Sequence, residues 1–226
     1  MRNRLLHMMQ IAGGTFPSGG FSQSWGLETY VYRGVVKDAE SFFEFLQVYL
    51  EAGIGRSEGP VMARAWELAE PFEPQQIRDL NAVSNALKAT AETRAAGIRM
   101  GKAFFRVMEG VLEDERMQQV KSLTRGIELS YPVIYGVVAR IMGIDLQAAM
   151  EGYVFNAANG LVQSAVKLIP LGNTEAQRIL YQASESLMHV VELSLEVPVE
   201  DVSNFCPGLD IASIEHETLP VRLYMS

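Results

Sequence analysis

The sequence predicts an all-α protein, a single globular bundle of about eight to ten helices that spans residues 1–226. Three observations favour this fold class. Apolar residues recur at helical spacing in most segments, no run of alternating β-branched residues stands out, and prolines and glycines divide the chain into stretches of helical length. The 226 residues are enough for one sizeable core, and no linker separates two domains.

The N-terminal block from Thr15 to Tyr30, TFPSGGFSQSWGLETY, is dense in glycine, serine and aromatic residues. Pro17 and the glycines after it predict a tight turn, because proline fixes φ and glycine accepts positive φ. Ser22 is placed to cap a helix that contains Trp25 in its first turn. The block lacks the G-x-S-x-G of a nucleophile elbow and the lysine of a phosphate-binding loop. A structural turn and a functional surface both remain open at this point.

Amphipathic periodicity predicts the helices of the central region. One apolar stripe lies in Ala39–Leu50 and another begins at Phe104. Their members are Phe42, Phe45, Leu46, Tyr49 and Leu50 in the first, and Phe104, Phe105, Met108, Val111 and Leu112 in the second. A proline precedes several periodic stretches, where it loses no intrahelical hydrogen bond if it lies in the first turn. These prolines are Pro60, Pro74 and Pro132.

A long helix with a polar stripe is predicted for Asp145–Ile169. Gly143 is typical of a helix stop, and Asp145 is typical of the N-cap that follows. The helix is otherwise apolar, through Val154, Phe155, Ala158, Leu161, Val162 and Val166. Its polar stripe consists of Asn156, Asn159, Gln163 and Lys167. The stripe is either a solvated helix face or the wall of a cavity or partner groove, where it could serve as a polar route or gate.

The last predicted helix runs from Thr174 to Glu196 and opens with Thr174-x-x-Gln177, the spacing of a capping box. Its buried face is predicted to contain Ile179, Leu180, Ala183, Leu187, Val190 and Val191. Beyond it, Glu200–Pro220 is the least periodic segment and predicts loop or short helix. We therefore expect residues 200–226 to form a loop-rich tail.

Composition and charge exclude several classes of partner. The net charge is −8 and no basic cluster occurs in the sequence, so nucleic acid and anionic membranes are poor partners and a basic protein is a better one. An acidic run, made of Glu109, Glu113, Asp114 and Glu115, could steer such a partner. The most apolar region, Tyr131–Met150, is interrupted by Arg140 and Asp145, which argues against a membrane span.

The sequence offers little for catalysis or for metal binding. The histidines are His7, His189 and His216, and none pairs with another at helical spacing. Cys206 and His216 are weak candidates for a transient metal contact, since two ligands do not complete a structural site. A small hydrolase that uses Ser18, His216 and an acidic residue is the less favoured alternative. The single cysteine excludes an internal disulfide and favours a cytoplasmic setting.

Three sequence blocks together carry a family resemblance. They are TFPSGGFSQSWGLETYV near the N-terminus, NGLVQSAVKLIPLG in the centre and HETLPVRLYMS at the end. In this order and at these places, the chain resembles the urease accessory protein F family (UreF) from Leu5 to Ser226. A generic helical adaptor would explain the composition but not the three blocks.

The resemblance implies an all-helical, non-enzymatic chaperone for nickel insertion that forms a homodimer. Such proteins bind the accessory protein UreD, also called UreH, and the complex recruits the nickel-carrying GTPase UreG and acts on apo-urease. The family is thought to bridge the other two proteins and to modulate GTP-dependent nickel delivery. No cofactor is expected to be bound permanently, since the complex handles nickel transiently. A water-filled nickel route proposed for the family would give the polar stripe a use.

The resemblance also assigns partner-binding residues. In the N-terminal block these are Pro17, Gly19, Phe21, Ser22, Gly26, Leu27, Glu28 and Tyr30, with Phe21 standing where other members can carry tyrosine. In the tail they are His216, Glu217, Arg222 and Ser226, and the family orders this tail when the UreD/UreH partner binds. The central block adds the K-x-x-P element of Lys167 and Pro170. Arg222 is the strongest single candidate, because a guanidinium can bridge carbonyls or a carboxylate.

Overall fold

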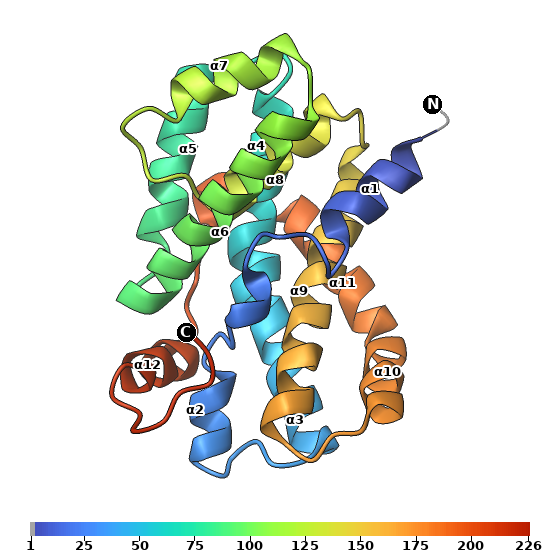
Figure 1. Cartoon of the computed structure of the whole chain (residues 1–226), viewed down its shortest axis with the longest axis vertical. Coiled ribbons are helices and arrows are strands. Elements are labelled where there is room, and N and C mark those ends of the chain that lie inside the picture. Colours follow the sequence, from blue (N-terminus) through green and yellow to red (C-terminus); the bar gives the residue numbers. More distant parts are fainter. Residues whose placement is uncertain (1–2) are drawn as a thin grey trace.

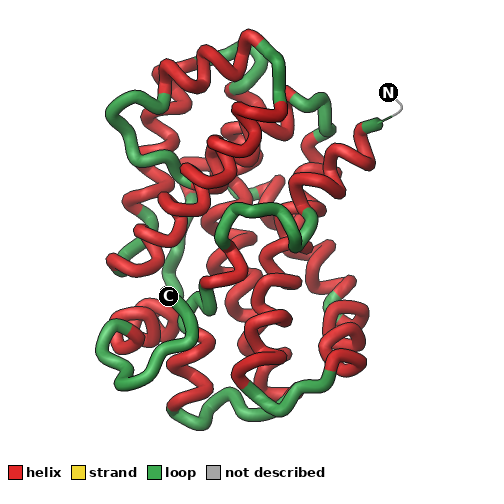
Figure 2. Tube along the Cα trace, viewed as in Figure 1, coloured by secondary structure: helices red, strands yellow, loops and turns green. Residues whose placement is uncertain are grey.

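The computed structural model describes residues 3–226 and is built from helices joined by loops, with no strand in that range (Figures 1 and 2). The first half contains α1 (Arg4–Ala12), α2 (Leu27–Tyr32), α3 (Ala39–Val48), α4 (Gly59–Leu68), α5 (Pro74–Ala86) and α6 (Ala91–Val111). The second half contains α7 (Glu115–Leu123), α8 (Tyr131–Ile141), α9 (Leu146–Leu168), α10 (Asn173–Gln182), α11 (Ser184–Glu196) and α12 (Pro207–His216). The all-α class is confirmed.

The described residues form slightly more helices than the number expected from the sequence, and one of the predicted helices is broken. The segment expected to run from Thr174 to Glu196 divides at Ala183 into α10 and α11. The capping box predicted at Thr174 is wrong, since α10 begins at Asn173 after Gly172 and has no side-chain cap bond. The six predicted apolar positions of this segment are nevertheless all buried. The helical spacing of apolar residues therefore continues across the break at Ala183, so the spacing does not reveal where the helix is interrupted.

Other helix signals are confirmed. Pro60, Pro74 and Pro132 each lie in the first turn of a helix, namely α4, α5 and α8. Asp145 caps α9, where its Oδ1 accepts a hydrogen bond from the Ala148 amide at 3.0 Å. Two apolar residues of the predicted helices do not reach the core, since Val111 and Phe155 are 49% and 48% exposed. Each lies at the edge of its apolar stripe, where helical periodicity does not separate interior from surface.

The core is organised around α8. All of its residues except Arg140 are buried, and it packs against α4 and α6. Gly136 lets α4 approach closely: a Cβ there would overlap the Met62 carbonyl oxygen and lie 3.0 Å from the Trp66 nitrogen. The rings of Phe104, Tyr135 and Tyr153 fill the adjoining space, with centroids 5.6 Å and 5.0 Å from Tyr135 to Phe104 and to Tyr153.

A π-helical segment from Tyr49 to Glu58 continues α3 into α4. Such widened turns are rare and often occur at functional sites. Here the segment ends at Glu58, whose carboxylate lies inside the protein beside the hydroxyl of Tyr153 at 2.6 Å. No helix within residues 3–226 combines the length and the apolar character needed to cross a bilayer.

Candidate functional site

The N-terminal block forms a turn followed by a short helix, but not in the predicted way. Gly20–Ser22 is a single 3-10 turn, and α2 begins only after Gly26, whose φ is +89°. The prediction that Ser22 caps the helix is therefore wrong, as is the placement of Trp25 in its first turn. Trp25 instead has a φ of +54°, a conformation that costs a non-glycine residue about 1 kcal/mol or more.

The C-terminal tail lies against this block. The Ser226 backbone oxygen accepts hydrogen bonds from the amide of Ser24 at 2.6 Å and from its hydroxyl at 2.7 Å. The Ser226 hydroxyl donates to Gln23 Oε1 at 2.6 Å, and the Met225 amide donates to the Ser22 carbonyl at 2.9 Å. Figure 1 shows the chain turning back from α12 toward the middle of the molecule to make this contact. We call residues 22–28 together with residues 216–226 the junction.

Glu28 is the centre of the junction. It is 8% exposed, and its two carboxylate oxygens accept hydrogen bonds from the amides of Leu223 at 2.7 Å and Tyr224 at 3.0 Å. Its Oε2 also lies 2.9 Å from Nε2 of His216, which is fully buried. One acidic side chain from α2 thus contacts both the last helix and the loop after it.

A second carboxylate, Glu92 of α6, completes the network. Its Oε2 lies 2.7 Å from Nδ1 of His216, and its Oε1 accepts a hydrogen bond from Nη1 of Arg222 at 2.8 Å. Both nitrogens of His216 therefore face carboxylates, one from α2 and one from α6. Sequence reasoning found Glu28, His216 and Arg222 but missed Glu92, which lies 130 residues from Arg222 and carries no local signal.

The remaining residues assigned from the resemblance have different surroundings. Leu27 is fully buried, and α12 packs so closely on α2 that a Cβ on Gly26 would lie 3.4 Å from the Ala212 Cβ. Phe21 is 69% exposed and Glu217 is also exposed. Tyr30 is half-buried, with its hydroxyl against Gly208. The structure thus divides the assigned residues into those that build the junction and those that face outward.

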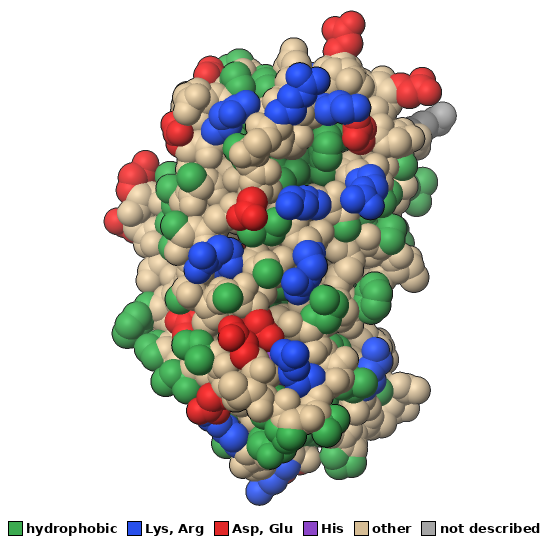
Figure 3. All heavy atoms as spheres, turned by 60° about the vertical axis from the view of Figure 1, so that its left-hand side comes forward, with side chains coloured by type: hydrophobic (Ala, Val, Ile, Leu, Met, Phe, Trp, Pro, Cys, Tyr) green, Lys and Arg blue, Asp and Glu red, His purple; other side chains and the backbone are tan. Residues whose placement is uncertain are grey.

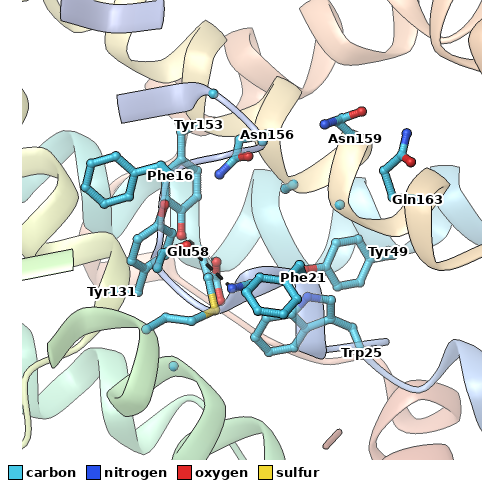
Figure 4. A pocket seen from close by; sticks show the side chains of 18 residues that line it. Phe16, Phe21, Trp25, Tyr49, Glu58, Tyr131, Tyr153, Asn156, Asn159 and Gln163 are labelled. Carbon is cyan, nitrogen blue, oxygen red and sulfur yellow. Dashed lines mark hydrogen bonds between the residues drawn. The ribbon is translucent and has the colours of Figure 1, made fainter. Parts of the chain in front are cut away.

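A cavity of about 100 Å³ lies beneath the N-terminal block. Figure 4 shows Phe21, Trp25 and Tyr49 on one side of it, Phe16, Tyr131 and Tyr153 on the other, and polar side chains of α9 projecting from its wall. Three of the four residues of the predicted polar stripe line it, namely Asn156, Asn159 and Gln163. The fourth, Lys167, does not line the cavity: its Nζ lies 5.9 Å from the centre of the Tyr224 ring at the junction.

The cavity contains one carboxylate and several buried phenols. Glu58 accepts hydrogen bonds from Tyr153 and from Lys88, whose ammonium also lies 5.8 Å from the centre of the Trp25 ring. Burial and, second to it, the Glu58 charge raise the pKa of Tyr49 and Tyr153 well above the usual value. Burial likewise raises the pKa of Tyr131, whose hydroxyl is buried without a protein partner. These phenols therefore remain neutral donors at physiological pH.

The two weaker site hypotheses can be compared with this geometry. Cys206 and His216 lie at opposite ends of α12, about 15 Å apart along its axis, so they do not share a metal ion. Within residues 3–226 no cluster of three or more His, Cys, Asp or Glu side chains is arranged to hold one. The imidazole nitrogens of His216 are both engaged by carboxylates, which leaves neither free to activate Ser18.

Comparison with known proteins gives a consistent result. The UreF family model matches residues 36–184. The urease accessory protein UreF of Bacillus sp. (strain TB-90) is 33% identical over 231 residues, covering 99% of this chain and all of the relative. The proteins of the same name from Geobacillus kaustophilus and Paenarthrobacter aurescens are 32% and 29% identical, and each alignment covers at least 97% of both chains. The junction lies outside the range of the family model, whereas the alignments with these relatives extend over nearly the whole chain.

Proposed function

Because this chain belongs to the UreF family, whose named relatives are urease accessory proteins, we propose that it is a non-enzymatic chaperone for nickel insertion into apo-urease. In this proposal it binds the UreD/UreH accessory protein, bridges it to the nickel-carrying GTPase UreG and modulates GTP-dependent delivery. It works in the cytoplasm as a homodimer, and nickel passes through the complex without becoming a permanent cofactor.

The observation that carries the proposal is the junction. Residues of the N-terminal block and the tail, assigned separately to partner binding, are joined there by a buried network around Glu28. Large apolar side chains of the same two segments stay outside the core: Phe21 is 69%, Val221 81%, Leu223 62% and Met225 52% exposed. Exposed apolar groups on a rigid frame suit recognition of another protein better than catalysis.

Removing the tail should test this proposal directly. Deletion of residues 215–226 removes the exposed apolar side chains of the tail and the groups that contact the Glu28 carboxylate. We expect the truncated chain to remain a folded dimer that no longer captures the UreD/UreH protein. Pulldown with tagged partner and circular dichroism measure the two properties. In an activation assay with apo-urease, the accessory proteins, nickel, bicarbonate and GTP, the truncated chain should behave as if it were absent. Capture of the partner by the truncated chain would contradict the assigned surface.

The cavity supports a second part of the proposal, a polar route or gate for the transferred ion. Amide oxygens of Asn156 and Asn159, phenols and the Glu58 carboxylate can bond to the water shell of a cation. Lys167 belongs to the same stripe, one turn beyond Gln163, and its ammonium lies near the Tyr224 ring of the junction, where we propose that it acts outside the cavity.

Blocking the cavity should lower nickel delivery without unfolding the protein. Asn156→Leu and Asn159→Leu replace amides with methyl groups, and we expect urease activation at limiting nickel to fall several-fold, or about 1 kcal/mol in the rate-determining step. Lys167→Ala is expected to have a smaller effect in the same direction. Gln147→Leu, at an exposed position of the same helix, is the matched control. If all four variants activated urease as well as the wild type does, the proposal that the ion passes through the cavity would be contradicted.

A further inference from the structure

The exposed face of α6 carries basic side chains that have no partner within the chain. Arg99, Lys102 and Arg106 are exposed and follow the spacing i, i+3, i+7, which places them within one narrow sector of the helix. The opposite face of α6 is buried through Ala96, Met100, Phe104 and Met108. Figure 3 turns the left-hand side of Figure 1 forward and shows Lys and Arg side chains at several heights on this side of the molecule. We call the three residues the basic stripe.

Carboxylates on the same face of α6 are already engaged. Glu92 binds His216 and Arg222, and Glu109 pairs with Lys121 of α7 at 2.7 Å. In the part of the chain that the structure describes, no carboxylate lies within ion-pair distance of the basic stripe. Local charge on this face is therefore positive, although the net charge of the chain is −8.

The acidic run expected to attract a basic partner is weakened by the fold. Glu109 is neutralised by Lys121, and Asp114 receives two hydrogen bonds from the Arg116 guanidinium, at 2.9 and 2.7 Å. These bonds lower the pKa of Asp114 and keep it ionised beside its own counter-charge. Among the described residues, Glu113 and Glu115 of the run stay exposed without an ion pair, so the charge just past the C-terminal end of α6 is acidic. The unpaired charge along the exposed face of α6 itself is basic, which adds a positive surface that the net charge of the sequence does not predict.

The size and surroundings of the stripe favour a short acidic segment of a protein. Arg99 and Arg106 are about 10 Å apart along the helix axis, the length of three extended residues. Three cations are fewer than the contacts that nucleic acids usually require, and Glu92 and Glu109 flank the stripe at both ends. Ala95 and Ala103 have small side chains, so they leave the helix surface beside the cations accessible. Arg99 also borders a groove formed with the tail by Ala91, Glu92, Glu217, Arg222 and Tyr224.

We infer that the basic stripe of α6 docks an acidic segment of a partner protein, with carboxylates of that segment bound to Arg99, Lys102 and Arg106. This surface lies beside the junction, and its test does not depend on the function proposed above. Electrostatic contacts of this kind contribute mainly to partner choice and association rate.

Binding of an acidic peptide tests this inference. The probe is a fluorescein-labelled peptide of six consecutive glutamates, whose anisotropy is followed with the full chain at low salt and at about 0.3 M salt. We expect binding at low salt that salt weakens, and about tenfold weaker binding by the variant Arg99→Gln/Lys102→Gln/Arg106→Gln. Undiminished binding by this variant would overturn the inference, as would failure of the wild-type chain to bind.

A charge-matched control separates the stripe from net charge. Arg4→Gln/Lys37→Gln/Arg178→Gln removes the same charge from exposed positions on other helices and loops, and it should bind the peptide within twofold of wild type, about 0.4 kcal/mol. An equal loss in both variants would mean that the peptide senses only the total charge, which contradicts the inference. A single-stranded hexanucleotide that displaces the peptide at lower concentration than unlabelled peptide would assign the stripe to nucleic acid instead.

Discussion

Glu28→Ala should detach the C-terminal tail from the N-terminal block while most helices remain folded. The variant leaves the amides of Leu223 and Tyr224 and the Nε2 of His216 without their acceptor in a buried site. Removing one partner of such a network costs about 3 kcal/mol. We expect trypsin to cleave after Arg222 about a hundredfold faster than in wild type, because cleavage follows the population of the detached tail. Capture of the UreD/UreH partner should be lost in parallel.

Two comparisons make this expectation specific. Glu28→Gln keeps the shape and one acceptor oxygen, so it should lose only part of the protection. Glu192→Ala removes a carboxylate from the exposed face of α11, which has no contact with the junction, and should leave both cleavage and partner capture unchanged. A Glu28→Ala chain that resists trypsin like the wild type would show that the tail is held by its other contacts.

Gly136→Ala should have a large effect on global stability. The added methyl group would overlap the carbonyl oxygen of Met62 and lie 3.1 Å from the Ala65 Cβ, so α4 and α8 must move apart at the centre of the core. Overpacking against backbone lies at the upper end of the usual range, about 3 kcal/mol. For a chain of this length that lowers the melting temperature by about 6–12 °C, which calorimetry measures.

Gly97→Ala is the same glycine-to-alanine change, but it should have the opposite effect on stability. Gly97 lies inside α6, and a Cβ there meets no atom within 4 Å. Alanine in a helix interior is favoured over glycine by about 0.5–1 kcal/mol, so this variant should be slightly more stable than wild type. If both variants destabilised the protein equally, the close approach of α4 at Gly136 would not be the cause of the destabilisation there.

Helical periodicity predicted the fold class and most helix positions because it reports which residues face the core. It predicted the buried positions of α10 and α11 but not the break between them at Ala183, since a break that preserves the direction of the apolar face leaves no mark in the pattern. Cap signals had mixed success for a similar reason. Asp145 caps α9, whereas Thr174 lies one residue inside α10 and cannot serve as its cap.

The candidate site could be predicted only in part. Glu28, His216 and Arg222 were assigned from the resemblance, and the structure joins them in one network. Glu92, which links two of them, had no signal because it lies on an ordinary amphipathic helix far away in the chain. The polar stripe of α9 left two interpretations open, and only three-dimensional packing shows that Asn156, Asn159 and Gln163 line a cavity. Charge was the least predictable property, since pairing within the fold decides which charges remain free.

The contact between Ser24 and Ser226 determines when the junction can form during synthesis of the chain. It joins residues 202 positions apart, so the chain must be synthesised through residue 226 before the N-terminal block acquires this contact. Until then Glu28 lacks the groups of residues 216–224 that contact its carboxylate, and nothing from this tail supports the positive φ of Trp25. A chain that stops before residue 226 therefore lacks the full junction, and a partner that binds there would recognise only chains in which both segments are present.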